Sequence, residues 1–234
     1  MVNYQMRTSN QIKEIKKFES DPFQVFEIIS AEQVGELIQV WHQSTDKVHK
    51  ETGPTTVKLE KTNPVLQHIM KKLKPTIGEC SIRYASFFDV ERPHVIHIDD
   101  DFDYPVAYKA ITIPLWHNGQ DTPDFYVFDQ HYYGGPAKFF KNRKTEPKVH
   151  YNKPIIDYST IDGLQDTGIN EYHMSQLDHL DNEWLEGLTV KESFSWTLGS
   201  AIVFDSLQLH CSGNFANQGV KRKIGLSIFT KDPK

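Results

Sequence analysis

Residues 201–212 read Ala-Ile-Val-Phe-Asp-Ser-Leu-Gln-Leu-His-Cys-Ser, two short apolar runs separated by Asp205 and Ser206. Such runs, bounded by residues that favour turns, are typical of β-strands. Similar runs occur elsewhere in the chain, and they predict eight strands in two groups of four: Cys80–Phe88, His94–Asp99, Val106–Trp116, Asp124–Asp129, Glu192–Thr197, Ala201–Asp205, Leu207–Ser212 and Arg222–Thr230. Because these strands are many and short, an antiparallel sandwich or barrel is favoured over a parallel sheet with crossover helices.

The segment before the strands has helical signals. Ser30 and Gln33 form a predicted capping box at the start of one helix, and Asn63-Pro64 starts a second helix. A short strand is predicted between residues 23 and 29. We expect one domain over residues 1–234, with residues 1–78 as helical support and residues 79–129 and 191–231 as the β-core. Residues 130–190 form an insert with a basic run between Lys138 and Lys148, and we expect this insert to act as a lid.

Composition excludes several classes of protein. The 234 residues carry 26 basic and 31 acidic side chains, a formal net charge of −5, so a protein that coats nucleic acid is not expected. The two cysteines, Cys80 and Cys211, exclude a disulfide framework and a four-cysteine zinc site. No apolar run is long enough to cross a membrane, and Met1–Asn10 lacks the apolar centre of a signal peptide. The expected location is the cytoplasm.

The stretch His94-Val-Ile-His97-Ile-Asp99 carries the most informative chemistry. Residues two apart on a strand point to the same face, so the imidazole of His97 and the carboxylate of Asp99 can converge on one point. They supply two of the three ligands of a two-histidine, one-carboxylate facial triad. His210, which follows a buried-looking strand, is the best candidate for the third ligand, ahead of the histidines of the insert.

This constellation resembles the Fe(II)- and 2-oxoglutarate-dependent oxygenases, in the style of the phytanoyl-CoA-hydroxylase and prolyl-hydroxylase branches. The resemblance rests on His97-x-Asp99, on His210 and on Arg222, which follows His210 by 12 residues. It implies a double-stranded β-helix, the cupin-like jelly roll, flanked by N-terminal α-helices. It also implies that His97, Asp99 and His210 bind Fe(II), and that Arg222 binds the far carboxylate of 2-oxoglutarate with parallel hydrogen bonds.

Two further site residues follow from the same resemblance, and a third follows from the alternation of a strand. Tyr84 lies on a strand where prolyl-hydroxylase-like members place a tyrosine that contacts the cosubstrate. Asn214 belongs to the pattern His210-x-Ser212-x-Asn214, which is similar to the phytanoyl-type motif, and we expect it near the ligands. His94 is expected beside the metal ligands rather than among them, because an odd spacing from His97 places it on the other face of a strand.

The expected activity is that of a dioxygenase that uses Fe(II), 2-oxoglutarate and O2, and most simply hydroxylates a small metabolite or amino acid with release of succinate and CO2. A protein side chain, as in prolyl hydroxylases, remains an alternative substrate, while a membrane partner is not expected and nucleic acid is disfavoured. A non-catalytic jelly-roll binding module is a second class of interpretation. A cupin-type metal enzyme without a cosubstrate is disfavoured, because the His-x-His cluster of that family is absent.

Overall fold

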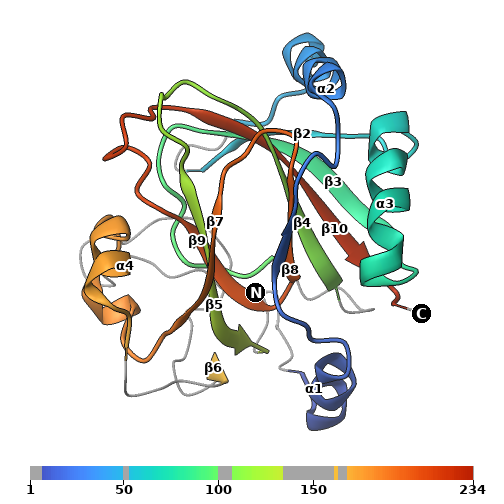
Figure 1. The fold of residues 1–234 in the computed structure, drawn as a ribbon. Helices are drawn as coiled ribbons and strands as arrows, with labels where there is room; N and C mark the ends of the chain where they lie inside the picture. Colours follow the sequence, from blue (N-terminus) through green and yellow to red (C-terminus); the bar gives the residue numbers. More distant parts are fainter. Residues whose placement is uncertain (1–6, 50–52, 100–106, 134–160, 163–167, 234) are drawn as a thin grey trace.

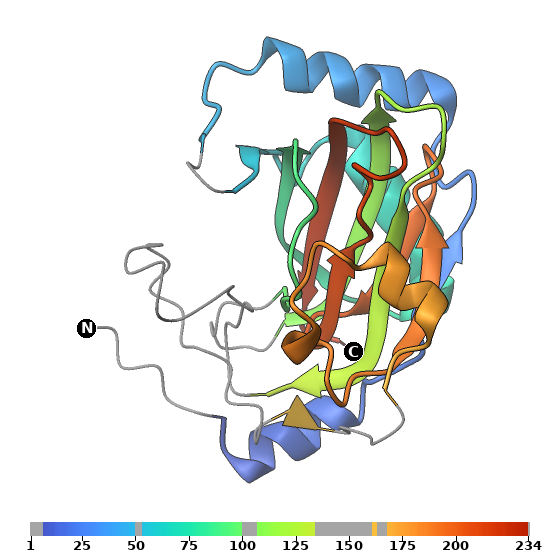
Figure 2. The same cartoon turned by 90° about the vertical axis from the view of Figure 1, so that its left-hand side faces the viewer.

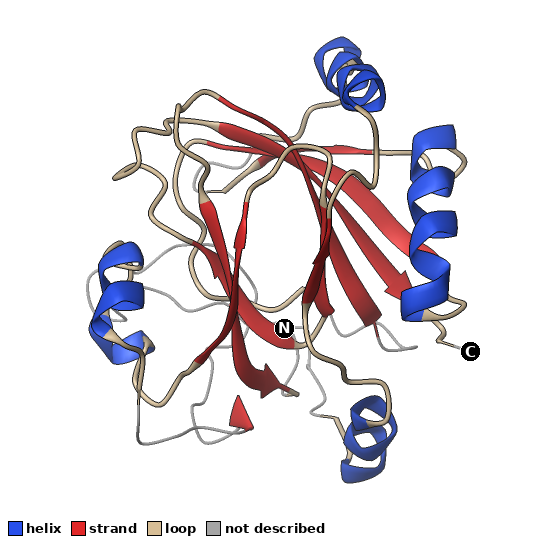
Figure 3. Ribbon diagram, in the orientation of Figure 1, coloured by secondary structure: helices blue, strands red, loops and turns tan. Residues whose placement is uncertain are grey.

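The computed structural model describes residues 7–49, 53–99, 107–133, 161–162 and 168–233. Two antiparallel sheets face each other and enclose the interior of a jelly roll, which confirms the predicted fold class (Figure 1). Helices lie on the outside of the sheets, as Figure 3 shows by colour. Among the described helices, none combines the length and the apolarity that crossing a membrane requires.

The larger sheet has six strands, in the order β1-β8-β4-β10-β3-β2. The bounds of these strands, in chain order, are Phe23–Val25 for β1, Thr55–Lys58 for β2, Ser81–Val90 for β3, Ala107–His117 for β4, Ala201–Asp205 for β8 and Lys223–Lys231 for β10. In the smaller sheet β5 pairs with three strands. The bounds here are Asp124–Tyr132 for β5, Ile161–Asp162 for β6, Val190–Ser195 for β7 and Gln208–Ser212 for β9.

Two helices begin at the residues that their capping signals predict. Helix α2, Ala31–Gln43, starts after Ser30, whose hydroxyl accepts from the Gln33 amide in a capping box. Helix α3, Pro64–Ile77, starts after Asn63 and ends at Gly78, whose φ of +76° suits glycine. The remaining helices are α1, Ser9–Lys16, and α4, Glu171–Gln176, followed by a 3-10 turn at Asn182–Trp184.

The larger sheet is buried on both faces, which decides how its side chains are used. The apolar residues of α2 and α3, including Leu37, Trp41 and Leu66, pack with Ile224 and Leu226 of β10 in one cluster. Figure 1 shows α3 along the outer side of this sheet, and Figure 2 shows α2 across one end of the molecule. The opposite face of β10 looks into the jelly roll. Both faces of β10 are therefore shielded from solvent, one by helices and one by the second sheet.

Several sequence predictions of elements differ from the structure. The expected strand His94–Asp99 is not a regular strand, and it touches β9 through a single antiparallel bridge between His97 and His210. Strand β1 ends at Val25 instead of residue 29, because Glu27 adopts a positive φ of 53° that breaks the extended chain. The edge strand β2 was not predicted, since its four residues carry little apolar signal.

Only part of the predicted insert, residues 130–190, belongs to the described residues. Leu177, Leu180, Leu185 and Leu188 pack on the outer side of the smaller sheet with the apolar residues of β5 and β9. The basic run of the insert, between residues 138 and 148, lies outside the described residues, as does most of the segment that was expected to form a lid. The division of the chain into these parts therefore stays a prediction.

Candidate metal centre

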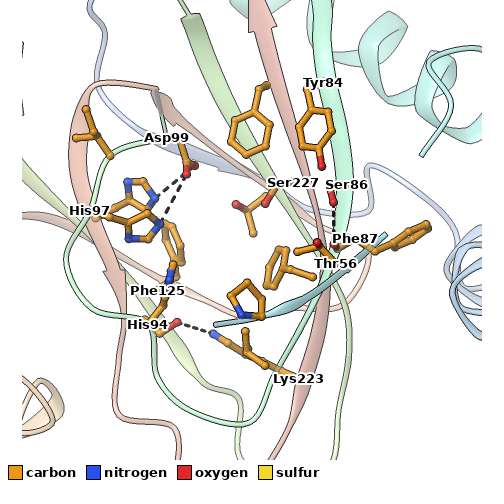
Figure 4. A pocket seen from close by; sticks show the side chains of 18 of the residues that line it. Thr56, Tyr84, Ser86, Phe87, His94, His97, Asp99, Phe125, Lys223 and Ser227 are labelled. Carbon is orange, nitrogen blue, oxygen red and sulfur yellow. Dashed lines mark hydrogen bonds and ion pairs between the residues drawn. The ribbon is translucent and has the colours of Figure 1, made fainter. Parts of the chain in front are cut away.

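His97, Asp99 and His210 lie together at one wall of the jelly-roll interior (Figure 4). One ligand atom from each residue falls within 4.8 Å of the others. The Nε2 atom of His97 is 3.7 Å from one oxygen of Asp99, and the Nε2 atom of His210 is 3.4 Å from the other. This is a two-histidine, one-carboxylate cluster of the kind that binds iron on one face.

Backbone pairing brings the three side chains together. The amide of His97 donates to the carbonyl of His210 at 3.0 Å, and the amide of His210 donates back to His97 at the same distance. The amide of Asp99 then donates to the carbonyl of Ser206 at 2.8 Å. Asp99 lies two residues after His97 in this segment, so its side chain points to the same side as that of His97. The two-residue spacing places both side chains on one side, as the sequence predicts, although the segment pairs with β9 only through a single bridge.

Both imidazoles are held in the form that a metal ligand requires. The Nδ1 atom of His97 lies 2.8 Å from the carbonyl of Val95, and that of His210 lies 3.0 Å from the carbonyl of Gln208. A carbonyl oxygen can only accept, so each Nδ1 carries the proton. Each Nε2 is therefore the ring nitrogen that faces Asp99 and can bind a metal ion. Backbone carbonyls that fix the tautomer in this way are the usual second partners of metal-binding histidines, so the three residues fit a divalent cation such as Fe(II).

A cavity of about 650 Å³ opens beside the three side chains. One wall carries the two histidines and Asp99, and the floor is the inner face of the larger sheet. Along β10 the lining residues are Lys223, Ser227 and Phe229, which alternate with the helix-covered residues of the same strand. Figure 4 shows Tyr84 and Lys223 at opposite ends of the cavity, with Ser227 between them.

Lys223 places a buried cation in this cavity. Its side chain is 1 % exposed, and its Nζ donates to the hydroxyl of Ser212 at 3.0 Å. The same Nζ lies 4.1 Å from the centroid of the Trp196 ring. Burial lowers the pKa of Lys223 to about 7, while the charges of Asp124 and Cys211 act in the opposite direction. No carboxylate of the described residues forms an ion pair with Lys223, so an anionic ligand would supply the missing charge.

Arg222 does not line the cavity. Its guanidinium makes two hydrogen bonds to the carboxylate of Asp89, at 2.8 and 2.5 Å, and 43 % of its side chain is exposed. By the alternation of a strand, Arg222 shares a face with Ile224 and Leu226, and those two residues pack with helices α2 and α3 on the face away from the cavity. Arg222 therefore lies outside the cavity in this structure, and its contact with 2-oxoglutarate stays a prediction.

Trp196 adds a second buried donor to the cation end of the cavity. It is 1 % exposed, and its Nε1 has no hydrogen-bond partner among the described residues. A Cβ built on Gly225 would lie 2.9 Å from the Cζ2 atom of Trp196, so this edge of the indole borders the cavity face of β10. Because an unpaired buried N–H costs free energy, it favours a ligand with an acceptor at this end.

The three other predicted site residues fall in different places. The ring of His94 packs edge-on against His97 at a centroid distance of 4.2 Å and lines the cavity, although an odd spacing had predicted opposite faces. Tyr84 also lines the cavity, at the end away from Lys223. Asn214 donates to the carboxylate of Asp178 at 2.6 Å and belongs to a surface turn near α4, so it is not among the residues that line the cavity.

Other histidines and aromatic residues were weighed from the sequence. His131 binds the buried carboxylate of Asp205, away from the metal cluster. His179 is largely buried rather than at the surface, and its burial lowers its pKa to about 4. Trp116 is 37 % exposed, while Phe128 and Phe204 are buried. None of these residues lines the cavity.

Comparison with known proteins places the fold. No protein-family model matches the sequence, and no curated protein matches it. The epimerase SnoN from nogalamycin biosynthesis, described as non-heme and alpha-ketoglutarate dependent, is 10 % identical, with a TM-score of 0.51 over 94 % of this chain and 84 % of its own. The carbocyclase SnoK from the same biosynthesis is 8 % identical, with a TM-score of 0.51 over 97 % of this chain and 84 % of its own.

A third solved structure is HygX from Streptomyces hygroscopicus, with nickel and 2-oxoglutarate bound. It is 8 % identical, with a TM-score of 0.50 over 97 % of this chain and 88 % of its own. At these identities the likeness is one of fold. The chain thus has the double-stranded β-helix fold of 2-oxoglutarate-dependent, non-haem metal enzymes, and it carries a two-histidine, one-carboxylate cluster inside that fold.

Proposed function

We propose that this chain is an Fe(II)- and 2-oxoglutarate-dependent dioxygenase that hydroxylates a small molecule, with His97, Asp99 and His210 as the iron ligands. The observation that carries this proposal is the buried ammonium of Lys223, which forms no ion pair with any described carboxylate and lies in the same cavity as the metal cluster. We assign the far carboxylate of 2-oxoglutarate to Lys223 in place of Arg222. When bound by the three ligands, iron(II) supplies oxidation coupled to the decarboxylation of 2-oxoglutarate to succinate and CO2.

The spacing between the metal cluster and the cation supports a five-carbon diacid. Ser212, which holds the Lys223 ammonium, follows His210 by two residues on β9, a separation of about 7 Å along a strand. The two carboxylate carbons of 2-oxoglutarate are separated by four C–C bonds of about 1.5 Å in a zigzag, or about 5 Å. With hydrogen-bond distance added at the lysine, the length of such a diacid is comparable to the spacing between His210 and the residue that holds the Lys223 ammonium.

The residues of this chain would then have distinct roles. The ammonium of Lys223 and the Nε1–H of Trp196 would bind the far carboxylate, and the hydroxyl of Ser212 would keep the ammonium in place. In a cavity lined by Trp196 and Phe88, the low polarity strengthens a charge-assisted hydrogen bond. The carbonyls behind His97 and His210 would keep both imidazoles oriented, and Asp99 would complete the ligand set.

The proposal is tested by anaerobic titration of Fe(II) and 2-oxoglutarate into the protein, with the visible absorption band of the chelate as readout. We expect the band in the wild type and in Arg222→Met, and we expect Asp99→Ala to lose it. A protein that folds but shows no band would instead support a non-catalytic binding module. If Asp99→Ala and His210→Ala both retain 2-oxoglutarate turnover, the ligand assignment is wrong.

A small molecule is the preferred substrate over a protein side chain. The cavity volume of about 650 Å³ lies within the range of about 300–1,000 Å³ typical of small-molecule sites. Succinate release in a screen of candidate compounds measures coupled turnover. A screen in which only peptides raise succinate release above the background would favour the protein-hydroxylase alternative.

A further inference from the structure

The side chains on the floor of the cavity change in chemical character from one end to the other. Strand β10 presents Lys223, Ser227 and Phe229 to the cavity, and Gly225 lies between the first two, so that successive positions of this face are about 7 Å apart. Lys223 and Phe229 are therefore about 20 Å apart along the strand. A five-carbon diacid that reaches from Lys223 to the metal cluster covers only the first part of this floor. The remainder, beyond Gly225, is available to a second ligand.

The middle of the floor is a row of hydroxyl groups on three neighbouring strands. Ser227 of β10 lies opposite Ser86 of β3 on one side and opposite Thr112 of β4 on the other. All three line the cavity. The hydroxyl of Ser86 already donates to backbone carbonyls of Val57 and Phe87. Within the described part of the chain, the side chains of Ser227 and Thr112 make no hydrogen bond with other residues, so both can bind a polar substituent of a ligand.

The end of the floor is a pair of stacked aromatic rings. Tyr84 and Phe229 lie opposite each other on β3 and β10, with ring centroids 5.8 Å apart and planes inclined by only 18°. Tyr84 remains 38 % exposed although it lines the cavity. A stacked pair with one open face offers a flat apolar surface on which a third ring can lie parallel. Asp99 is the only carboxylate among the described lining residues, so this end contains no acidic partner for a cationic ligand.

We infer that Tyr84 and Phe229 form the binding platform of the primary substrate, and that this substrate is a small molecule with a flat ring that is not cationic and that bears a hydroxyl or carbonyl group. The ring lies on the platform and its polar group bonds to Ser227 or Thr112. This inference rests on the proposed function, because it takes the cation end of the cavity to be filled by 2-oxoglutarate. It assigns Tyr84 to substrate binding, whereas the sequence predicted that Tyr84 contacts the cosubstrate.

The test is a binding measurement on protein loaded with Zn(II) and 2-oxoglutarate, which cannot turn over. The probes are 2-naphthol and its saturated analogue decahydro-2-naphthol, which share a skeleton and a hydroxyl but differ in flatness. Saturation-transfer NMR titrations give the Kd of each. We expect 2-naphthol to bind at least tenfold more tightly than the saturated analogue. We expect Tyr84→Leu and Phe229→Leu to reduce this preference to less than threefold, and Tyr84→Phe to retain it.

The matched control is Phe26→Leu, which alters an aromatic residue that is 62 % exposed and outside the cavity lining. It should leave both Kd values unchanged. Equal binding of the two probes to the wild type, or an unchanged preference in both leucine variants, would overturn the platform. Binding of 2-oxoglutarate is measured first on the same samples. Loss of that binding refutes the proposed function, whereas intact 2-oxoglutarate binding without ring preference refutes only the platform.

Discussion

Replacement of Lys223 by methionine should raise stability and abolish cosubstrate binding at the same time. Burial shifts the pKa of Lys223 from its ordinary 10.5 to about 7. At 1.36 kcal/mol for each unit of pKa, this shift costs the folded state about 4 kcal/mol at pH 7. Methionine is similar in length and carries no charge. Since the hydrogen bond to Ser212 and the contact with Trp196 are lost, we expect a net gain of about 1–3 kcal/mol in the free energy of unfolding.

The cost of burying Lys223, and with it the stability difference between wild type and Lys223→Met, depends on pH. Between pH 7 and 10.5 the unfolded chain holds a proton on Lys223 that the folded protein has released, so the stability of the wild type rises with pH. The destabilisation is fully present below pH 7 and disappears above pH 10.5. Urea unfolding of wild type and Lys223→Met should therefore show the largest difference near or below pH 7 and converge toward pH 10.

Lys223→Met should also lose affinity for 2-oxoglutarate. Removal of one partner of a buried charge pair costs about 3–5 kcal/mol, which corresponds to a loss of affinity of at least about 100-fold. Calorimetric titration of 2-oxoglutarate into the Fe(II)-loaded protein under nitrogen measures it. Arg222→Met is the matched control, because it leaves the 7 % exposed carboxylate of Asp89 without its partner. It should destabilise the protein and bind 2-oxoglutarate normally.

Lys223→Met and Arg222→Met are expected to change stability in opposite directions and to differ in 2-oxoglutarate binding, so together they distinguish the roles of the two basic residues. If Lys223→Met binds 2-oxoglutarate like the wild type, the assignment of the far carboxylate fails. If Arg222→Met loses binding while Lys223→Met retains it, the original expectation from the sequence is correct. If Lys223→Met is less stable than the wild type at pH 7, the pKa of Lys223 is not lowered as the argument requires.

Three further predictions concern the same cavity and the base of the sheet. Binding of 2-oxoglutarate should be accompanied by uptake of about one proton by Lys223 above pH 7 and by none well below pH 7, because the bound carboxylate raises the lowered pKa of Lys223. Calorimetry at pH 6 and pH 8, in buffers of different ionisation enthalpy, measures this uptake. Gly225→Ala should cost about 1–3 kcal/mol and weaken 2-oxoglutarate binding, because its Cβ would lie 2.5 Å from the ring of Phe88; denaturant unfolding and the same titration check both effects. Lys109→Met should cost about 3–5 kcal/mol by removing the ammonium partner of the buried carboxylate of Asp205, and a second change, Asp205→Leu, should recover most of that loss in thermal unfolding.

Much of the fold follows from local patterns. Helices α2 and α3 begin where Ser30 and Asn63 predict, since a capping side chain acts on amides only two or three residues away. Seven of the eight predicted strands are present, because alternation and apolar runs are local signals as well. The exception, at residues 94–99, shows the limit: its residues satisfy a strand pattern but meet β9 only at one bridge, which depends on a partner more than 100 residues away.

The metal cluster could be predicted because its information is concentrated in residue type and spacing. His97 and Asp99 are two residues apart, and this spacing places both on one side even without a regular strand. His210 was chosen as the third ligand because it follows a buried-looking strand and because the set resembles a family, since nothing local links the two segments. The tautomer of each histidine depends on the carbonyls of Val95 and Gln208, which no sequence pattern specifies.

The sequence by itself thus determined the candidate ligand residues and their spacing, through His97 and Asp99, and it placed a basic residue at the start of the last strand. The tertiary structure decided which basic residue faces the cavity. Arg222 and Lys223 are adjacent, and both faces of β10 are buried, so alternation alone cannot tell the helix-covered face from the cavity face. Only the packing of α2 and α3 against Ile224 and Leu226 assigns the faces, and with them the cation that a carboxylate can reach.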